Sequence, residues 1–332
     1  MRIDLGTDRY PCQMSRRLGH RTSWRRAGWA IGIFVLLFMA ASAVGSYAAV
    51  AGNRGPFATP ARDIGPRHEN VRFPSRIDRI SLAGWLFHAG AGDSRRSVIL
   101  VHGWGGNRED VDFVPIARRF LAEGFDVLMF DMRGSGQSGG SHQTLAAEEP
   151  RDVLGAYDFM RARGYDPAHM VILGNSMGAA AVIEAAPKLT GVAALICDSS
   201  FTTAGAAVEN GLAQLTGLPG ALSLPALAFA HLWGVNGAVS PIKVVRQLPS
   251  RAFLFIQSRG DNLIPPSSAE QLRAASKNPA SKLLLINSRG HLNTFNAEPA
   301  RFMRAVNAFI TQQMAARHAH AASETPGPST RA

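Results

Sequence analysis

Short, continuous apolar runs recur along the chain, and segments with helical spacing separate them. The runs lie at residues 97–102, 126–131, 170–174, 192–198, 252–258 and 282–288. Strands that are apolar throughout are typical of parallel sheets covered on both faces by helices. The spacing predicts helices near 109–123, 148–164, 177–188, 267–276 and 298–315, and an antiparallel start to the sheet at 70–74 and 79–88. We therefore expect an α/β fold with a mostly parallel central sheet.

A longer apolar run precedes these elements. No charged residue lies between residues 26 and 54, and about 20 apolar residues are enough to span a bilayer. A cleaved signal peptide usually has a shorter apolar core and a small-residue cleavage site, which the Ala-Ser-Ala at 41–43 would supply. The length of the run, with Trp24 and Trp29 at its edge, favours an uncleaved transmembrane anchor over residues 27–52.

Charge beside this run predicts its orientation. Residues 1–26 form a basic arm with seven arginines and two aspartates, and fewer arginines follow the run. Positive charge marks the cytoplasmic side of a membrane segment, so we expect a cytoplasmic N-terminus and a domain outside the cytoplasm, periplasmic in a bacterium. The net charge is +11 overall, but the folded body is only mildly basic. No basic stripe interleaved with aromatic residues stands out, so we expect no nucleic-acid partner.

Composition predicts a folded body with less regular flanks. Apolar residues make up 46% of the chain and charged residues 18%, which excludes a disordered protein. We interpret residues 53–69 as a linker, 70–316 as the folded domain and 317–332 as a disordered tail. Two cysteines are too few for a disulfide framework or a Cys-based zinc module, and the HxH pair at 318–320 is too small a ligand set. We expect no metal.

The residues with catalytic potential follow the ends of predicted strands, where α/β proteins gather their functional groups. The sequence Gly-Asn-Ser-Met-Gly at 174–178 follows one strand and precedes an alanine-rich helix. This is the G-x-S-x-G pattern in its strand–turn–helix context, in which a strained turn exposes the serine hydroxyl and small neighbours avoid collisions. We predict that Ser176 is a nucleophile rather than a structural turn residue.

A serine hydroxyl needs a base to accept its proton, and in this arrangement the order along the chain is serine, acid, histidine. His291 is the histidine downstream of Ser176 that follows a strand, whereas His231 lies in an apolar stretch typical of a core or lid. Asp261 follows the preceding strand in a loop framed by glycine and proline, and it is the predicted acid. Asp198 also ends a strand and is the alternative; otherwise we interpret it as a loop anchor.

Two backbone N–H groups are expected to stabilise the negative oxygen of the transition state. One belongs to Met177, directly after the nucleophile, and the other to Trp104 in the glycine-rich loop at 102–107. We interpret His102 as a strand-end residue that shapes this loop.

A second glycine motif matches a different kind of site. Gly134, Gly136 and Gly139 match the G-x-G-x-x-G of a dinucleotide site. The match does not open directly into a clear helix, which favours a tight loop packed near the nucleophile. We expect no organic cofactor.

Six motifs in this order resemble the α/β-hydrolase superfamily, in its serine hydrolase branch of esterases, lipases and serine aminopeptidase-like enzymes. They are HGWGGN (102–107), DMRGSGQSGG (131–140), GNSMG (174–178), DSSF (198–201), SRGDNLIPP (258–266) and SRGH (288–291). The resemblance covers residues 70–315. It implies a nucleophile, acid and base at Ser176, Asp261 and His291, with oxyanion donors at Trp104 and Met177. Superfamily members that use an aspartate nucleophile are disfavoured.

An apolar insertion follows the fourth of these motifs. Residues 199–242 contain a single charged residue, Glu209, against a chain average of 18%. We expect a short helical cap at about 200–240. One interpretation is that the cap covers the core. The other is that it forms an acyl-chain pocket or a lid that dips into the bilayer, because large apolar patches mark ligand or membrane contact.

Together these features predict a serine hydrolase that cleaves carboxylic esters, with lipophilic acyl esters favoured, through an acyl-enzyme on Ser176. Expected partners are a small-molecule or lipid ester and the membrane. One alternative is a serine peptidase or aminopeptidase that uses the same triad, although the sequence offers no evident carboxylate cluster for a substrate amine. Another is a non-catalytic, membrane-tethered binding protein.

Overall fold

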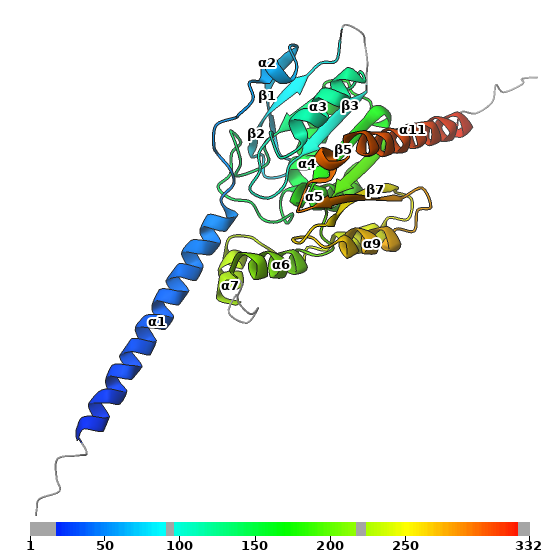
Figure 1. Cartoon of the computed structure of the whole chain (residues 1–332). Helices are drawn as coiled ribbons and strands as arrows, with labels where there is room; N and C mark the ends of the chain where they lie inside the picture. Colours follow the sequence, from blue (N-terminus) through cyan, green and yellow to red (C-terminus); the bar gives the residue numbers. More distant parts are fainter. Residues whose placement is uncertain (1–17, 91–95, 217–223, 325–332) are drawn as a thin grey trace, which may run out of the picture.

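An eight-stranded sheet organises the computed structural model of the chain, which describes residues 18–90, 96–216 and 224–324 (Figure 1). The strands lie in the order β1-β2-β4-β3-β5-β6-β7-β8. Their bounds are β1 His68–Pro74, β2 Ser81–Phe87, β3 Ser97–Val101, β4 Asp126–Phe130, β5 Met170–Asn175, β6 Ala194–Asp198, β7 Phe253–Gly260 and β8 Lys282–Arg289. The pairs β1–β2 and β2–β4 are antiparallel, and all the pairs from β4 to β8 are parallel. The predicted sheet and its antiparallel start are therefore confirmed.

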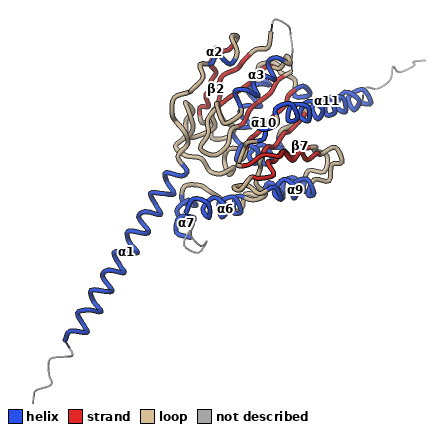
Figure 2. The backbone as a smooth tube through the Cα atoms, in the orientation of Figure 1, coloured by secondary structure: helices blue, strands red, loops and turns tan. Residues whose placement is uncertain are grey.

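Helices lie on both sides of the sheet (Figure 2). On one side are α4 (Pro150–Ala162), α5 (Met177–Ala185), α8 (Pro241–Gln247) and α9 (Pro266–Ala275), and on the other are α3 (Phe113–Ala122) and α11 (Pro299–Glu324). Alternate residues of β3 enter the two cores: Ile99 belongs to the first and Val98 to the second. Because successive side chains of a strand point to opposite faces, a strand that is covered twice must be apolar at every position.

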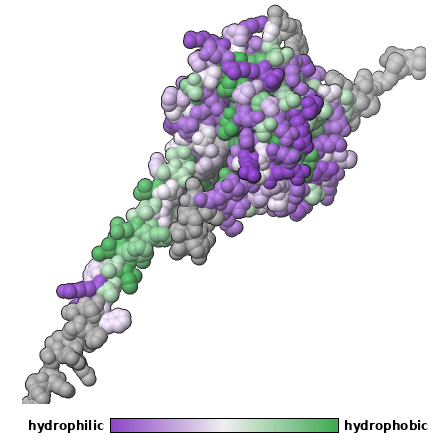
Figure 3. All heavy atoms as spheres, in the orientation of Figure 1, coloured by the Kyte–Doolittle hydropathy of each residue, from purple (hydrophilic) through white to green (hydrophobic). Residues whose placement is uncertain are grey.

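A long helix, α1 (Leu18–Val50), extends away from this body (Figure 1). Its apolar side chains face outward along the stretch coloured green in Figure 3, with Phe34 and Leu36 each 69% exposed. Among the described residues it is the one helix long and apolar enough to cross a membrane, over Trp24–Val50. A signal sequence near an N-terminus can be equally long and apolar.

The C-terminal end of α1 packs on the body. Val50 is buried, and the ring of Tyr47 meets that of Trp233 edge to face, with 5.0 Å between centroids. The segment that follows, predicted as a linker, contains α2 (Ala61–Ile64) and makes further contacts. The N–H groups of Ala58 and Thr59 both donate to the Glu109 carboxylate.

The apolar insertion contains α6 (Ala204–Thr216) and α7 (Leu224–Leu232), with residues 217–223 outside the described part of the chain. Helix α7 packs against α1 (Figure 1). Helix α11 continues to Glu324, so the first residues of the predicted tail are helical, and the remainder, 325–332, lies outside the described residues.

Candidate active site

Ser176 occupies a sharp turn between β5 and α5. Its backbone has φ 51° and ψ −116°, a conformation that costs a residue with a side chain on the order of 1–3 kcal/mol. The Ser176 N–H donates to the Asp198 carbonyl oxygen at 2.8 Å, which holds the turn against the end of β6. A Cβ atom on Gly178 would lie 2.1 Å from the Val101 carbonyl oxygen. Glycine at that position therefore lets α5 approach the neighbouring strand and keeps the turn in place.

Two hydrogen bonds connect Ser176, His291 and Asp261. The Ser176 hydroxyl lies 2.8 Å from Nε2 of His291, and Nδ1 of the same ring lies 2.7 Å from Oδ2 of Asp261. The three residues follow β5, β8 and β7, so the sheet brings its carboxyl ends together at this point. The structure thus joins the three residues that the sequence selected.

Donors other than the histidine hold the Asp261 carboxylate in place. Its Oδ1 accepts the N–H groups of Leu263 and Ile264, both at 2.9 Å, and its Oδ2 accepts the side-chain amide of Gln257 at 2.8 Å. The side chain is completely buried, so these donors replace water around the charge. Gln257 was not predicted, and the sequence signal for it is a polar residue directly after the apolar run of β7.

The same bonds fix the tautomer of the imidazole. An ionised carboxylate only accepts hydrogen bonds, so Nδ1 of His291 donates to Asp261. Nε2 is then left with a lone pair directed at the Ser176 hydroxyl. The ring is ready to accept a proton from that hydroxyl.

Asp198, the alternative acid, is bonded to other partners. Its carboxylate accepts the hydroxyl groups of Ser199, at 2.9 Å, and of Thr294. Burial raises the pKa of Asp198 to about 7. Asp261 therefore faces the histidine, and Asp198 ties the end of β6 to the start of α10 (Thr294–Ala297).

Replacing Asp198 with asparagine should stabilise the protein more at pH 8 than at pH 5. A carboxyl whose native pKa is raised stabilises the native state below its ordinary pKa near 4, and this contribution disappears as the pH rises to about 7. At pH 8 the wild-type chain carries a buried charge that asparagine lacks. Thermal melting at both pH values tests this. Asp63→Asn on the exposed helix α2 is the control, and equal shifts in Tm at the two pH values would contradict the prediction.

The loop at 102–107 leaves one backbone donor free between two that are occupied. The N–H of Gly103 donates to the Asp110 carboxylate at 2.6 Å, and that of Gly105 donates to Oε1 of Gln143 at 2.7 Å. Within the described residues, the N–H groups of Trp104 and Met177 have no acceptor. The two predicted oxyanion donors are thus available to a ligand. Asp110 and Gln143, which hold the loop, were not predicted.

His102 is hydrogen-bonded at the start of the same loop. It is fully buried, its Nδ1 donates to the Gly103 carbonyl oxygen at 2.8 Å, and its Nε2 accepts the Met132 N–H at 2.9 Å. Both ring nitrogens are occupied, as expected for a residue that shapes the loop rather than one that moves protons.

The glycine motif resembling a dinucleotide site has no free backbone donors. The N–H groups of Gly134, Gly136 and Gly139 donate to the carbonyl oxygens of Gly139, Asn53 and Ser81, at 2.7–2.8 Å. A phosphate site needs such groups pointing at the ligand. The described residues also contain no group of three or more His, Cys, Asp or Glu side chains placed to hold a metal ion.

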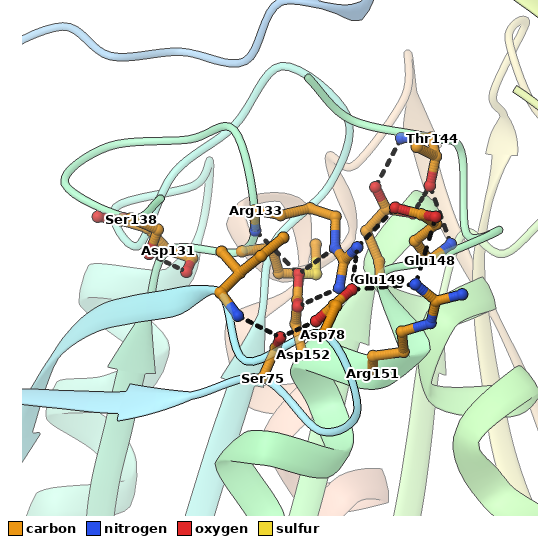
Figure 4. Close-up of polar contacts among 12 residues, drawn as sticks. Ser75, Asp78, Asp131, Arg133, Ser138, Thr144, Glu148, Glu149, Arg151 and Asp152 are labelled. Carbon is orange, nitrogen blue, oxygen red and sulfur yellow. Dashed lines mark hydrogen bonds and ion pairs between the residues drawn. The ribbon is translucent and has the colours of Figure 1, made fainter. Parts of the chain in front are cut away.

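Ion pairs fix the start of this glycine-containing loop. Arg133 lies among carboxylates, bonded to Asp152 at 2.8 Å, Glu148 at 2.7 Å and Asp78 at 2.9 Å (Figure 4). The Arg108–Asp131 pair is also buried, with an Nη2–Oδ2 distance of 2.6 Å. Buried pairs of this kind contribute little net stability but cost several kcal/mol when one partner is removed, so they hold the loop in one place.

Known structures share this architecture. The chain aligns with the esterase Pf2001 of Pyrococcus furiosus with a TM-score of 0.69, covering 80% of this chain and 98% of that one at 22% identity. The fold is that of the α/β-hydrolases.

Sequence comparison gives further relatives. The Hydrolase_4 family model, described as serine aminopeptidase, S33, matches residues 92–233. The uncharacterized protein YfhR of Escherichia coli is 27% identical over 236 residues, which cover 69% of this chain and 75% of YfhR. An uncharacterized protein of Mycobacterium tuberculosis is 28% identical over 238 residues, covering 71% and 76%. Together with the fold, these matches support a hydrolase.

Proposed function

We propose that the protein is a serine hydrolase that cleaves carboxylic esters through an acyl-enzyme on Ser176. The hydrogen-bonded series of Ser176, His291 and Asp261 carries this proposal. It supplies a nucleophile, a base that touches it, and a carboxylate that orients the base, which is the arrangement that activates a serine.

In the first step the Ser176 oxygen attacks the carbonyl carbon while Nε2 of His291 takes its proton. The carbonyl π electrons move onto oxygen, and the N–H groups of Trp104 and Met177 stabilise that charge, each by about 2.7–4 kcal/mol. Asp261 stabilises the imidazolium. When the tetrahedral intermediate collapses, the ester C–O bond breaks and His291 returns the proton to the leaving alcohol. In the second step, water attacks the acyl-enzyme while His291 takes its proton. The bond to Ser176 then breaks, the proton returns to the Ser176 oxygen, and the carboxylic acid is released.

The apolar insertion supports a lipophilic acyl group. Residues 199–242 carry one charge, and α7 within them packs beside the apolar helix α1. An acyl chain bound there gains up to roughly 0.8 kcal/mol for each buried CH₂. The esterase activity in the name of the Pyrococcus furiosus protein is compatible with this substrate class.

The main alternative is a serine aminopeptidase, which the description of the matching family model favours. Such an enzyme needs a free carboxylate for the substrate amine. Next to the oxyanion loop, Asp110 accepts the N–H groups of Gly103 and Val111, and Glu109 accepts two from the segment after α1. Both carboxylates are already paired, so we favour the ester.

We also propose that α1 anchors the protein in a membrane, with the N-terminus in the cytoplasm and the hydrolase domain outside it. Two features support this. Leaving the apolar side chains of α1 in water would be costly, at about 25 cal/mol per Å². The arginines concentrate on the N-terminal side of the apolar stretch of α1, and Trp24 and Trp29 lie exposed at that end.

A substrate series on the purified full chain tests the function. We expect kcat/KM for p-nitrophenyl esters to rise from acetate to octanoate by about tenfold or more, because part of the added chain is buried. Aminoacyl p-nitroanilides should be cleaved poorly, and a fluorophosphonate should modify Ser176.

Each other outcome selects a different function. A preference for acetate would exclude a lipophilic substrate, and a preference for the anilides would support the aminopeptidase. The absence of an adduct at Ser176, with Ser176→Ala as the reference for background labelling, would favour a non-catalytic binding protein.

A further inference from the structure

The end of helix α1 is hydrogen-bonded to a loop of the hydrolase domain. We call residues 50–54 the juxtamembrane segment and residues 131–144 the bridging loop. The carbonyl oxygen of Val50 accepts the Gln143 N–H at 2.8 Å, and that of Asn53 accepts the Gly136 N–H at 2.7 Å. The Arg54 guanidinium donates to further carbonyl oxygens of the loop, with a bond of 3.0 Å to Ser138. The contact is therefore mostly with backbone.

Gln143 connects this contact to the candidate active site. The residue is completely buried, and each of its polar side-chain atoms has a partner. Its Nε2 donates to the Ser135 hydroxyl at 2.8 Å, and its Oε1 accepts the Gly105 N–H at 2.7 Å. One residue thus connects the juxtamembrane segment, through its backbone N–H, with the loop that carries Trp104, through its side chain.

The geometry of Trp104 depends on that bond. Gly103 is held by Asp110 on one side, and Gly105, with φ +70°, is held by Gln143 on the other. The free N–H of Trp104 lies between these two fixed points. Losing either one lets the peptide rotate, which moves the proposed oxyanion donor.

The ends of the bridging loop have their own supports, and Gly139 in its middle donates to the Ser81 carbonyl oxygen, whereas the N–H groups of Gly136 and Gln143 are bonded to the juxtamembrane segment. Arg133 pairs with Asp152 at one end, and at the other Thr144 donates its N–H and hydroxyl to Glu149, at 2.6 and 2.8 Å (Figure 4). Between them, residues 134–143 lie against the juxtamembrane segment. The position of Gln143 is therefore sensitive to whether that segment is docked.

We propose that Gln143 is a positioning residue for the oxyanion loop, and that the juxtamembrane segment supports the active site by holding Gln143. This inference rests on the proposed function. It requires that undocking the segment lowers kcat even for an ester that dissolves in water, because the defect lies in the catalytic loop and not in access to a membrane.

Two glycines of the N-terminal region provide a matched test in the full chain in detergent. A Cβ on Gly52 would lie 2.6 Å from both the Gly134 carbonyl oxygen and the Ser135 hydroxyl, whereas a Cβ on Gly45 meets nothing within 4 Å. We expect Gly52→Ala to lower kcat for p-nitrophenyl acetate by about tenfold with KM nearly unchanged, since an oxyanion donor acts on the transition state. Gly45→Ala should leave both parameters as in the wild type.

A second pair of variants addresses Gln143 itself. Gln143→Leu removes the acceptor of the Gly105 N–H, and we expect kcat to fall by about 10–100-fold, up to the loss of one oxyanion donor. Gln143→Glu keeps an oxygen at that position, and the Ser135 hydroxyl can turn to donate to it, so most of kcat should return. If Gln143 had a purely structural role, the two variants would have the same kcat whenever they have the same Tm.

Hydrogen–deuterium exchange of the peptide covering 102–107 gives a readout without substrate. Exchange should be faster in Gly52→Ala and Gln143→Leu than in the wild type, and unchanged in Gly45→Ala. Arg54→Ala, at an exposed position, replaces Gly52→Ala if the latter does not fold. A wild-type protein without hydrolase activity would refute the proposed function and leave exchange as the test. Unchanged exchange and kcat in the folded variants would overturn the inference.

Discussion

Ser176→Ala should lower kcat for ester hydrolysis by about 10⁵–10⁶-fold, since removing the nucleophile disables the whole triad. The hydroxyl is the group of this side chain that bonds to His291, and alanine fits the space that it leaves. The fold should therefore persist. Initial rates on p-nitrophenyl butyrate and a thermal melt measure both effects.

A second buried serine provides the control for this variant. The Ser200 hydroxyl donates to the Phe201 carbonyl oxygen at 3.2 Å and is not bonded to His291. Ser200→Ala should keep its activity within a few-fold of the wild type. If Ser176→Ala retained a tenth of the wild-type activity, Ser176 would not be the nucleophile.

Asp261→Asn should lower kcat by about 10⁴-fold with little change in KM. An asparagine accepts the Leu263 and Ile264 N–H groups through its Oδ1 and turns its amide towards Nδ1 of His291. The imidazole then takes the other tautomer, with a proton on Nε2, and can no longer accept one from Ser176. Rates measured on a soluble ester across pH test this expectation.

Asp198→Asn is the matched control for the acid. Both aspartates lie at the carboxyl ends of strands, both are buried, and Asp261 is the one that bonds to His291. Asp198→Asn should therefore lose less than tenfold in kcat. A larger loss in Asp198→Asn than in Asp261→Asn would exchange the roles of the two residues.

The sheet was predictable because doubly covered strands leave a strong signal. The run at 126–131 corresponds to β4 at Asp126–Phe130, and the other strands agree within a few residues. The helix predicted at 109–123 begins instead at Phe113. The residues before it are used in turns, in which Asp110 binds the Gly103 N–H, and such local bonds compete with helix formation.

The candidate site was predictable only in part. Ser176 follows from turn chemistry and His291 from its position after the last strand. The sequence favoured Asp261 over Asp198 because of its loop, but both lie at strand ends, and the bond to His291 is what distinguishes them in the structure. Gln143 left no signal, since its importance comes from contacts with residues that are distant in the chain.

The packing of residues 50–54 on the bridging loop also bears on how the domain would move if α1 anchors it in a bilayer, as proposed. With α1 inserted in a bilayer, a freely jointed tether would let the domain tumble, whereas hydrogen bonds to carbonyl oxygens of the loop remove the joint. Rotation about the membrane normal then remains and tilting is restricted. Ser176 would then stay at a nearly constant height above the lipid headgroups.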